Sequence, residues 1–149
     1  MPEIYEHHHT VRQDEIDGQG HANNVVYVRW MQDAAVAHSA AQGWPGERYA
    51  LAGFGWVVRW HRIEYLQPAL AGDQLLICTW VATMQKVMSL RRYRFVRAGD
   101  QALLGTAETM WAFIDYATAR PARILPAVAA AFTVVDDPAD SPLVVPKGL

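Results

Sequence analysis

The densest cluster of polar residues in the chain is the segment DEIDGQGHANN at residues 14–24. It combines carboxylates, a histidine, two glycines and two asparagines directly before an apolar, alanine-rich segment. A helix that begins there presents unpaired backbone N–H groups and a partial positive charge, and such donors can stabilise an oxyanion on a reacting carbonyl. A carboxylate beside them can act as a nucleophile or as a general base toward water. The segment therefore holds the parts of an acyl-transfer site.

The same residue types also have a structural interpretation. Asp and Asn before a helix are commonly N-caps, because their side-chain oxygens accept hydrogen bonds from free backbone N–H groups. Glycine in such a segment commonly serves a turn. Composition and spacing leave the capping and the catalytic interpretations both open.

Two other reactive residue types are expected to be structural. His7, His8 and His9 are adjacent, and in a strand His8 faces away from the other two, so we expect no metal site. Cys78 lies in the apolar run LLIC, which indicates a buried thiol. No glycine-rich cofactor motif is present, and we expect no cofactor.

The element that must position the loop is a long helix over residues 25–42. Asn23 or Asn24 is the expected N-cap, Gly43 is the expected C-terminal stop, and Pro45 prevents continuation. Apolar residues at three-and-four spacing predict a largely buried helix; the predicted stripe comprises Tyr27, Trp30, Met31, Ala34, Ala35 and His38.

The rest of the chain has the alternating pattern of strands. The order is one strand, a long helix, then an antiparallel meander, which predicts an α+β domain over residues 1–149, with a sheet curled around the helix. Open strand edges in such a sheet invite dimerisation. Residues after about 120 form a proline-rich C-terminal extension with a short helix at 127–132. The predicted strands cover residues 4–13, 54–65, 74–84, 87–97 and 102–116.

Composition narrows the function classes. The 149 residues carry a formal net charge of -2 and are 52% hydrophobic, as in a globular protein. A nucleic-acid partner is not expected, because there is no basic excess. No apolar stretch approaches the roughly 20 residues of a membrane helix, the N-terminus lacks the pattern of a signal peptide, and the single cysteine fits a reducing compartment. We therefore expect a cytoplasmic protein with no membrane partner.

Residues 11–27, VRQDEIDGQGHANNVVY, resemble the signature of the 4-hydroxybenzoyl-CoA thioesterase-like hotdog family. The shared pattern is an acid, two residues, Gly-His-x-Asn-Asn, two residues and Tyr. Residues 63–73, IEYLQPALAGD, resemble the family's second strand and the following turn, and the likeness extends over about residues 4 to 125. It implies a hotdog fold, in which a curved antiparallel sheet of about five strands wraps a central helix. It also implies a homodimer or homotetramer with active sites between subunits.

The resemblance implies hydrolysis of an acyl-CoA thioester, or of an acyl-carrier-protein thioester, to a free carboxylic acid. The family's catalytic aspartate falls on Asp17, as general base or nucleophile. Its oxyanion donor is a backbone N–H at the helix start, near Asn24, Val25 or Val26. The substrate-binding candidates are His21, Asn23, Tyr27 (chiefly a packing residue) and Ser89, which relatives place close to substrate from the partner subunit. The candidates for the coenzyme A phosphates are Lys86, Arg91 and Arg92.

One departure from the family limits this transfer. Some relatives carry a histidine seven residues after the aspartate, where this chain has Asn24, so no catalytic histidine is assigned. The alternative function is a non-catalytic hotdog that binds acyl groups or serves as an assembly subunit; a hotdog dehydratase is disfavoured because its catalytic pair is not evident. An aromatic, short-chain or medium-chain acyl group would each suit an apolar tunnel.

Overall fold

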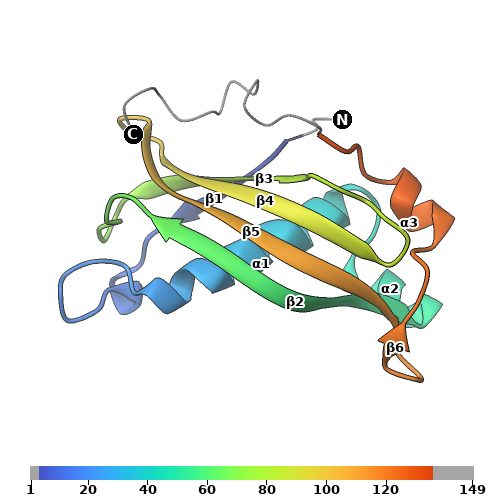
Figure 1. Cartoon of the computed structure of the whole chain (residues 1–149). Coiled ribbons are helices and arrows are strands. Elements are labelled where there is room, and N and C mark those ends of the chain that lie inside the picture. Colours follow the sequence, from blue (N-terminus) through green and yellow to red (C-terminus); the bar gives the residue numbers. More distant parts are fainter. Residues whose placement is uncertain (1–3, 136–149) are drawn as a thin grey trace.

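A long helix lies against the concave side of a curled antiparallel sheet (Figure 1). The computed structural model describes residues 4–135. The sheet order is β1-β3-β4-β5-β2, and a two-residue strand β6 pairs with β5. The predicted α+β hotdog fold is therefore confirmed. The elements are β1 (Tyr5–Thr10), α1 (Asn24–Ala41), β2 (Phe54–Tyr65), β3 (Gln74–Val81), β4 (Met88–Arg97), β5 (Ala102–Asp115) and β6 (Arg120–Pro121).

Three short helices complete the described elements: η1 (Gln13–Glu15), α2 (Gly46–Ala52) and α3 (Pro126–Ala130). The prediction that the first strand extends to residue 13 is wrong, because the chain turns into η1 there. The second long strand ends at Val81 and not at residue 84. Helix α2 was not expected, because seven residues between glycines give no measurable apolar period.

Helix α1 begins and ends within one residue of the predicted range 25–42 and has the predicted buried stripe. Asn23 is the N-cap, and its side chain accepts a hydrogen bond from the N–H of Val25 at 3.0 Å. At the other end Gly43 has φ +92°, a left-handed conformation that glycine adopts without strain. Every member of the predicted stripe is buried: Tyr27, Trp30, Met31, Ala34, Ala35 and His38.

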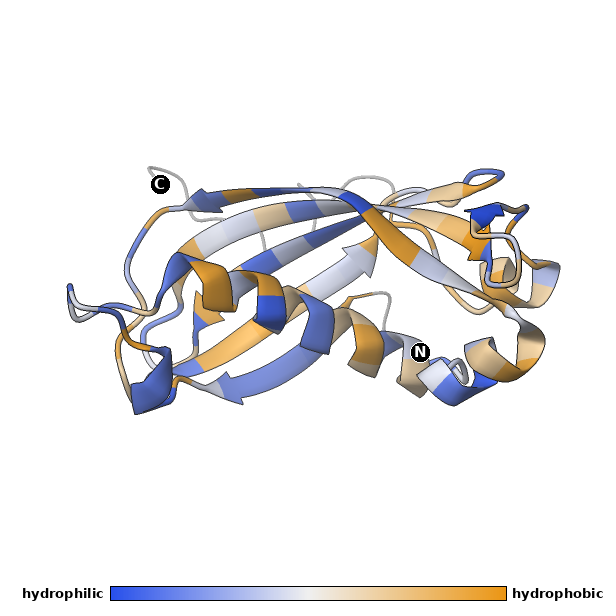
Figure 2. Ribbon diagram, turned by 90° about the horizontal axis from the view of Figure 1, so that it is seen from below, coloured by the Kyte–Doolittle hydropathy of each residue, from blue (hydrophilic) through white to orange (hydrophobic). Residues whose placement is uncertain are grey.

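The core has two parts, and α1 contributes buried side chains to the first of them. In Figure 2 hydrophobic and hydrophilic residues alternate along α1, with the sheet behind it. The first part, under the N-terminal half, centres on Tyr27, Trp30 and Phe95. The second includes Trp44, Tyr49 and Phe113, together with Ile124, Val128 and Phe132 from the predicted C-terminal extension. Part of the predicted extension, as far as Phe132, thus contributes to the core, whereas its residues 136–149 lie outside the described residues.

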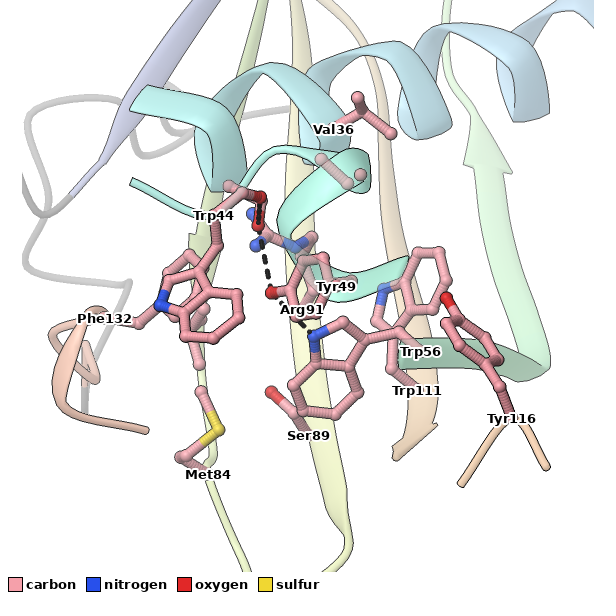
Figure 3. A pocket seen from close by; sticks show the side chains of 14 residues that line it. Val36, Trp44, Tyr49, Trp56, Met84, Ser89, Arg91, Trp111, Tyr116 and Phe132 are labelled. Atoms are coloured by element: carbon pink, nitrogen blue, oxygen red, sulfur yellow. Dashed lines mark hydrogen bonds between the residues drawn. The ribbon is translucent and has the colours of Figure 1, made fainter. Parts of the chain in front are cut away.

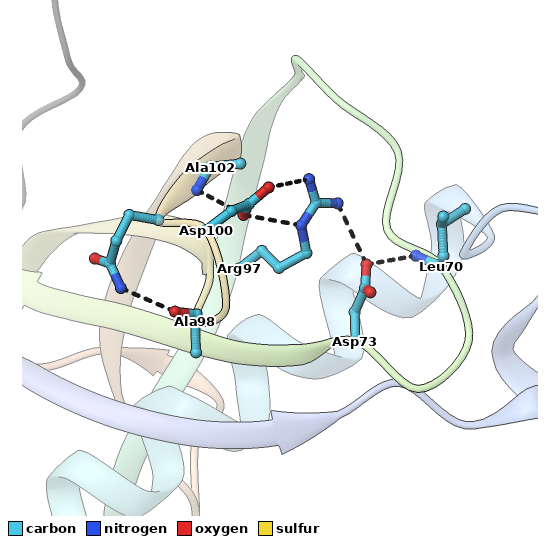
Figure 4. Close-up of polar contacts among 7 residues, drawn as sticks. Leu70, Asp73, Arg97, Ala98, Asp100 and Ala102 are labelled. Carbon is cyan, nitrogen blue, oxygen red and sulfur yellow. Dashed lines mark hydrogen bonds and ion pairs between the residues drawn. The ribbon is translucent and has the colours of Figure 1, made fainter.

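A polar network braces the turn between β2 and β3 (Figure 4). The Asp73 carboxylate accepts hydrogen bonds from Leu70 N–H at 2.9 Å and from Arg97 at 3.4 Å, and Arg97 also binds Asp100. The braced turn holds the loop before α1, because Asp73 O accepts from Val11 N–H at 2.9 Å. The carbonyl of Ala69, in the same turn, accepts from Ala22 N–H at 2.8 Å.

Strand β2 is an edge strand and carries exposed apolar side chains. It pairs only with β5 among the described strands, and Val57 and Trp60 are 38% and 44% exposed. A long edge with unpaired backbone groups can pair with another chain. Within residues 4–135, no helix combines the length and hydropathy needed to span a bilayer.

The cap of α1 gives a direct test of the helix start. Asn23→Ala should lower the free energy of unfolding by about 0.5–2 kcal/mol, because the Val25 N–H loses its acceptor. The measurement is urea denaturation at neutral pH. Asn24→Ala is the matched control, because its exposed side chain takes no part in the cap; equal losses in both variants would contradict the assignment of Asn23.

Candidate active site

The buried carboxylate of Glu15 anchors the loop that precedes α1. Its Oε1 lies 2.8 Å from His9 Nε2 and accepts from Arg12 N–H at 2.9 Å, and its Oε2 accepts from Trp30 Nε1–H at 2.9 Å. Burial alone would raise the pKa of Glu15, but the hydrogen bonds from Arg12, His9 and Trp30 lower that pKa below its ordinary value. The Glu15 carbonyl also accepts from Asn23 N–H at 2.8 Å. One residue therefore joins β1, the loop and the start of α1.

Asp17 lies two residues farther along, in a tight half-exposed turn. Its Oδ1 accepts from the N–H of Gln19 at 2.9 Å and of His21 at 3.4 Å. Its backbone N–H donates to the carbonyl of His21 at 2.8 Å, and Gly20, with φ +84°, closes the turn. The turn holds one carboxylate oxygen in place, and no protein hydrogen bond to the other is found in the described residues.

Of the first three backbone N–H groups of α1, that of Asn24 has no protein acceptor in residues 4–135. The N–H of Val25 is bound by the Asn23 side chain and that of Val26 by the Asn23 carbonyl at 3.0 Å. The N–H of Asn24 precedes the helical ladder and has neither kind of partner. Of the three predicted oxyanion donors, Asn24 is therefore the free one.

The other residues predicted around this loop have identifiable positions. His21 is half-buried and contributes backbone atoms to the Asp17 turn. Asn23 serves as the cap. Tyr27 is 2% exposed and packs edge-on against Phe95 and Tyr65, as expected for a packing residue.

A pocket of about 180 Å³ lies at the other end of α1 (Figure 3). Its walls come from α1, α2 and four strands, and Trp56 Nε1–H donates to the Tyr49 hydroxyl at 3.1 Å, which fixes two of its rings. Ser89, predicted to lie near substrate, lines it, and its hydroxyl donates to the Thr83 carbonyl at 2.7 Å. The aromatic lining consists of Trp44, Tyr49, Trp56, Trp111, Tyr116 and Phe132.

Arg91 also lines this pocket and is 6% exposed. Its Nη1 donates to His38 Nδ1 at 2.9 Å and to the Thr79 hydroxyl at 3.0 Å. Burial, together with the charge of Arg91, lowers the pKa of His38 to about 3, so the imidazole is neutral at physiological pH. Burial also lowers the pKa of Arg91, yet a guanidinium stays charged in proteins.

The three cations proposed for coenzyme A do not form one cluster. Arg92 follows Arg91 in β4 and therefore points to the opposite face, where it pairs with Glu108 at 3.0 Å. Lys86 lies in the exposed loop before β4 and lines a second hollow with Arg123. Met84 borders both hollows, so Lys86 and Arg123 stand beside the aromatic pocket.

The loop and the pocket are far apart within one protomer. Asn24 begins α1, whereas the pocket is lined from the same helix by Ala35, Val36 and Ser39. Twelve residues separate Asn24 from Val36, which corresponds to about 18 Å along the helix axis. The predicted catalytic residues and the pocket therefore lie at opposite ends of the molecule.

Several of these residues carry no recognisable sequence signal. Glu15 stands between two other acids, Asp14 and Asp17, and only its contacts in the fold, with His9, Arg12 N–H and the distant Trp30, distinguish it. The pocket rings come from six segments, and three of them, Trp44, Tyr49 and Phe132, lie outside the predicted strands. Within residues 4–135, no three His, Cys, Asp or Glu side chains are placed to share a metal ion.

The sequence profile of the thioesterase-like superfamily matches residues 11–132. No curated relative matches the chain in sequence.

Solved structures of thioesterases share the fold. A Lactobacillus plantarum protein assigned as an oleoyl thioesterase superposes with a TM-score of 0.82 at 23% identity over 90% of this chain; the chain spans 53% of that protein. A 1,4-dihydroxy-2-naphthoyl-CoA thioesterase from Synechocystis has a TM-score of 0.80 at 18% identity, and the match covers 86% of this chain and 94% of that one. An acyl-ACP thioesterase from Bacteroides thetaiotaomicron has a TM-score of 0.82 at 18% identity, and the match covers 92% of this chain and 57% of that one.

The anchoring carboxylate leads to a pH-dependent prediction. Glu15→Gln replaces one carboxylate oxygen with an N–H₂ group, which must then face other donors. The free energy of unfolding at pH 7 should therefore fall by about 1.5–3 kcal/mol, the value of a lost hydrogen bond to a charged group. The folded-state pKa of Glu15 is lowered, so its contribution is complete above about pH 4.5 and is lost as the pH falls through that lowered pKa. Urea titrations should show the gap between the two proteins narrowing below that pH.

Glu6→Gln is the control, because Glu6 is exposed on the neighbouring strand β1. It should follow the wild type at all pH values. A pH-independent gap for Glu15→Gln would mean that the carboxylate charge is not what anchors the loop.

Proposed function

The chain belongs to the thioesterase-like superfamily, and we propose that it hydrolyses an acyl-CoA thioester to a free carboxylic acid and CoA. Similar structures include thioesterases named for acyl-CoA and for acyl-ACP substrates. Lys86 and Arg123 beside the aromatic pocket favour CoA, because two cations suit its phosphates. An acyl-carrier-protein thioester is the second substrate class, and a non-catalytic acyl-binding protein is the alternative from a different functional class.

The observation that carries this proposal is the hydrogen-bonded link between Asp17 and the free N–H at the helix start. Asp17 binds His21 through one backbone hydrogen bond and through its side chain, which accepts from His21 N–H, and the Glu15 carbonyl holds Asn23. The carboxylate and the Asn24 N–H are thereby held in one rigid segment. A preorganised donor beside a base is the arrangement that acyl transfer requires.

The chemistry follows from these two groups. The thioester carbonyl oxygen would accept a hydrogen bond from Asn24 N–H, which stabilises the negative charge that develops on it. In one route Asp17 takes a proton from water as the water oxygen attacks the carbonyl carbon. In the other the Asp17 carboxylate attacks, and water then hydrolyses the resulting anhydride. In both routes the C–S bond breaks and CoA leaves as a thiolate that is then protonated.

A homodimer would bring the separated halves of the site together through β2. Trp56, at one end of β2, lines the pocket, and Tyr65, at the other end, donates to the Asn24 carbonyl at 3.2 Å. These ends are about 30 Å apart in an extended strand. Antiparallel pairing of two β2 edges about a two-fold axis exchanges the ends, so that one protomer's Asn24 lies beside its partner's pocket. The exposed Val57 and Trp60 on this edge support such pairing.

Substitution of Asp17 tests the enzyme against the binding protein. Asp17→Asn keeps an oxygen for the N–H groups of Gln19 and His21 but removes charge and basicity. We expect kcat for the best acyl-CoA substrate to fall by at least ~100-fold, with the melting temperature unchanged. The assay follows release of free thiol across an acyl-CoA panel.

Asp14→Asn is the matched control, because Asp14 lies three residues earlier in the same loop and is exposed. It should retain full activity. A folded Asp17→Asn protein with near-wild-type turnover would remove Asp17 from the mechanism, and a wild type inert toward every thioester would favour the binding protein.

The shared site makes a separate prediction about mixed dimers. Asp17→Asn disables the loop, and Val36→Trp places an indole at the pocket wall, so each variant alone should be inactive. Co-expressed, they form hybrids in which one site holds both defects and the other is intact, and random pairing should restore about a quarter of wild-type activity. Analytical ultracentrifugation should give a dimer or a larger oligomer. A monomer, or a mixture that stays inactive, would contradict the shared site.

A further inference from the structure

Arg91 lines the aromatic pocket without a counter-charge in the described residues. Its partners there, His38 and Thr79, are neutral, and both are bound by Nη1. No carboxylate of residues 4–135 lies within ion-pair distance of Arg91, and the pocket lining contains no Asp or Glu. An unpaired buried charge is costly in a folded protein. The Arg91 guanidinium can therefore bind an anion that is not part of the described residues.

The free donors of Arg91 suit one kind of anion. With Nη1 occupied, the Nε–H and the two N–H groups of Nη2 have no acceptor among residues 4–135. This edge of a guanidinium presents parallel donors that match the two oxygens of a carboxylate. The neutral His38, which accepts from Nη1, fixes the orientation of the fork and adds no competing charge.

The size and walls of the pocket restrict what carries the carboxylate. A dry cavity of roughly 150 Å³ admits benzene, so the 180 Å³ here accommodates one ring with a small substituent. Trp44, Trp56 and Trp111 line it, and flat rings pack favourably against such side chains by stacking or edge-on contact.

We propose that the acyl group of the substrate is a single aromatic ring that carries a carboxylate at the end away from the thioester, with this carboxylate bound by Arg91. The assignment rests on the proposed thioesterase function for its link to catalysis. The binding step itself does not require turnover, so it is tested apart from hydrolysis.

The binding test uses two small ligands that differ only in the distal carboxylate. Monomethyl terephthalate carries a ring, an ester and a carboxylate, whereas methyl benzoate lacks the carboxylate. By calorimetry the wild type should bind the first roughly 10–100-fold more tightly, the range for a hydrogen bond to a charged group. Equal affinities would overturn the proposal without requiring any variant.

Variants of Arg91 then separate a ligand-binding role from a structural one. Arg91→Met removes a buried unpaired charge at similar volume, which is often neutral or stabilising, so its melting temperature should not fall while the preference for monomethyl terephthalate disappears. Arg91→Lys keeps the charge without the fork and should retain part of the preference. A preference that survives in Arg91→Met would place the anion elsewhere. If Arg91→Met does not fold, a full preference in Arg91→Lys would count against the fork.

An internal counter-charge is the competing explanation, because Asp136 and Asp137 follow Val135 in the sequence and Val135 N–H donates to the carbonyl of the pocket residue Val81 at 2.9 Å. The double variant Asp136→Asn/Asp137→Asn should bind both ligands as the wild type does. A carboxylate preference that emerges only in this variant would overturn the proposal.

The catalytic arm compares 4-carboxybenzoyl-CoA with benzoyl-CoA. The wild type should favour the first in kcat/KM, mainly through KM, and Arg91→Met should lose this preference. Equal hydrolysis of the two CoA thioesters, together with equal binding of the two small ligands, would refute the carboxylate assignment and leave the thioesterase function intact. Preferential ligand binding with no hydrolysis of any thioester would refute the enzyme and leave Arg91 as an anion site.

Discussion

The buried carboxylate of Glu15 is the constraint on which the arrangement of the helix start depends. A carboxylate can be buried only if donors satisfy it, and those of Glu15 come from β1, from the loop and from the indole of Trp30 within α1. Removing any of these donors would leave part of a charge desolvated. The loop is therefore fixed against the helix before Asp17 is reached, and on its other side the turn braced by Asp73 and Arg97 holds it to the sheet.

The second constraint is the length of α1. A helix of 18 residues spans about 27 Å, so a loop at its start and a pocket near its end cannot serve one small substrate within a protomer. Within strand β2 the segment from Trp56 to Tyr65 covers a similar distance, about 30 Å; Tyr65 contacts the start of α1 and Trp56 lines the pocket. A two-fold axis across that strand offers a simple geometric solution, because it reverses one copy relative to the other without changing either fold.

The sequence predicts the features that arise from local periodicity, but it does not predict environments that contacts between distant residues create. The stripe from Tyr27 to His38 and the cap at Asn23 follow from helical spacing and side-chain chemistry, and the starts of β2, β3 and β5 match the predicted residues. Helix α2 is too short to show a period. Glu15 and Arg91 acquire their environments from residues 15 and 53 positions away, which no local pattern encodes. The roles of Asp17 and Ser89 rest on resemblance and stay predictions.

The free donor at the start of α1 belongs to the main chain and not to the asparagine side chain. Any residue that keeps its N–H and tolerates the first helical position would present the same hydrogen to a substrate, and only proline would remove it. Exchange of the side chain at position 24 is therefore open to adjust the polarity of the entrance, whereas at Asp17 the side chain itself carries the proposed chemistry. Positions 17 and 24 of one site would thus differ in their tolerance to substitution, and a mutational scan would detect only position 17.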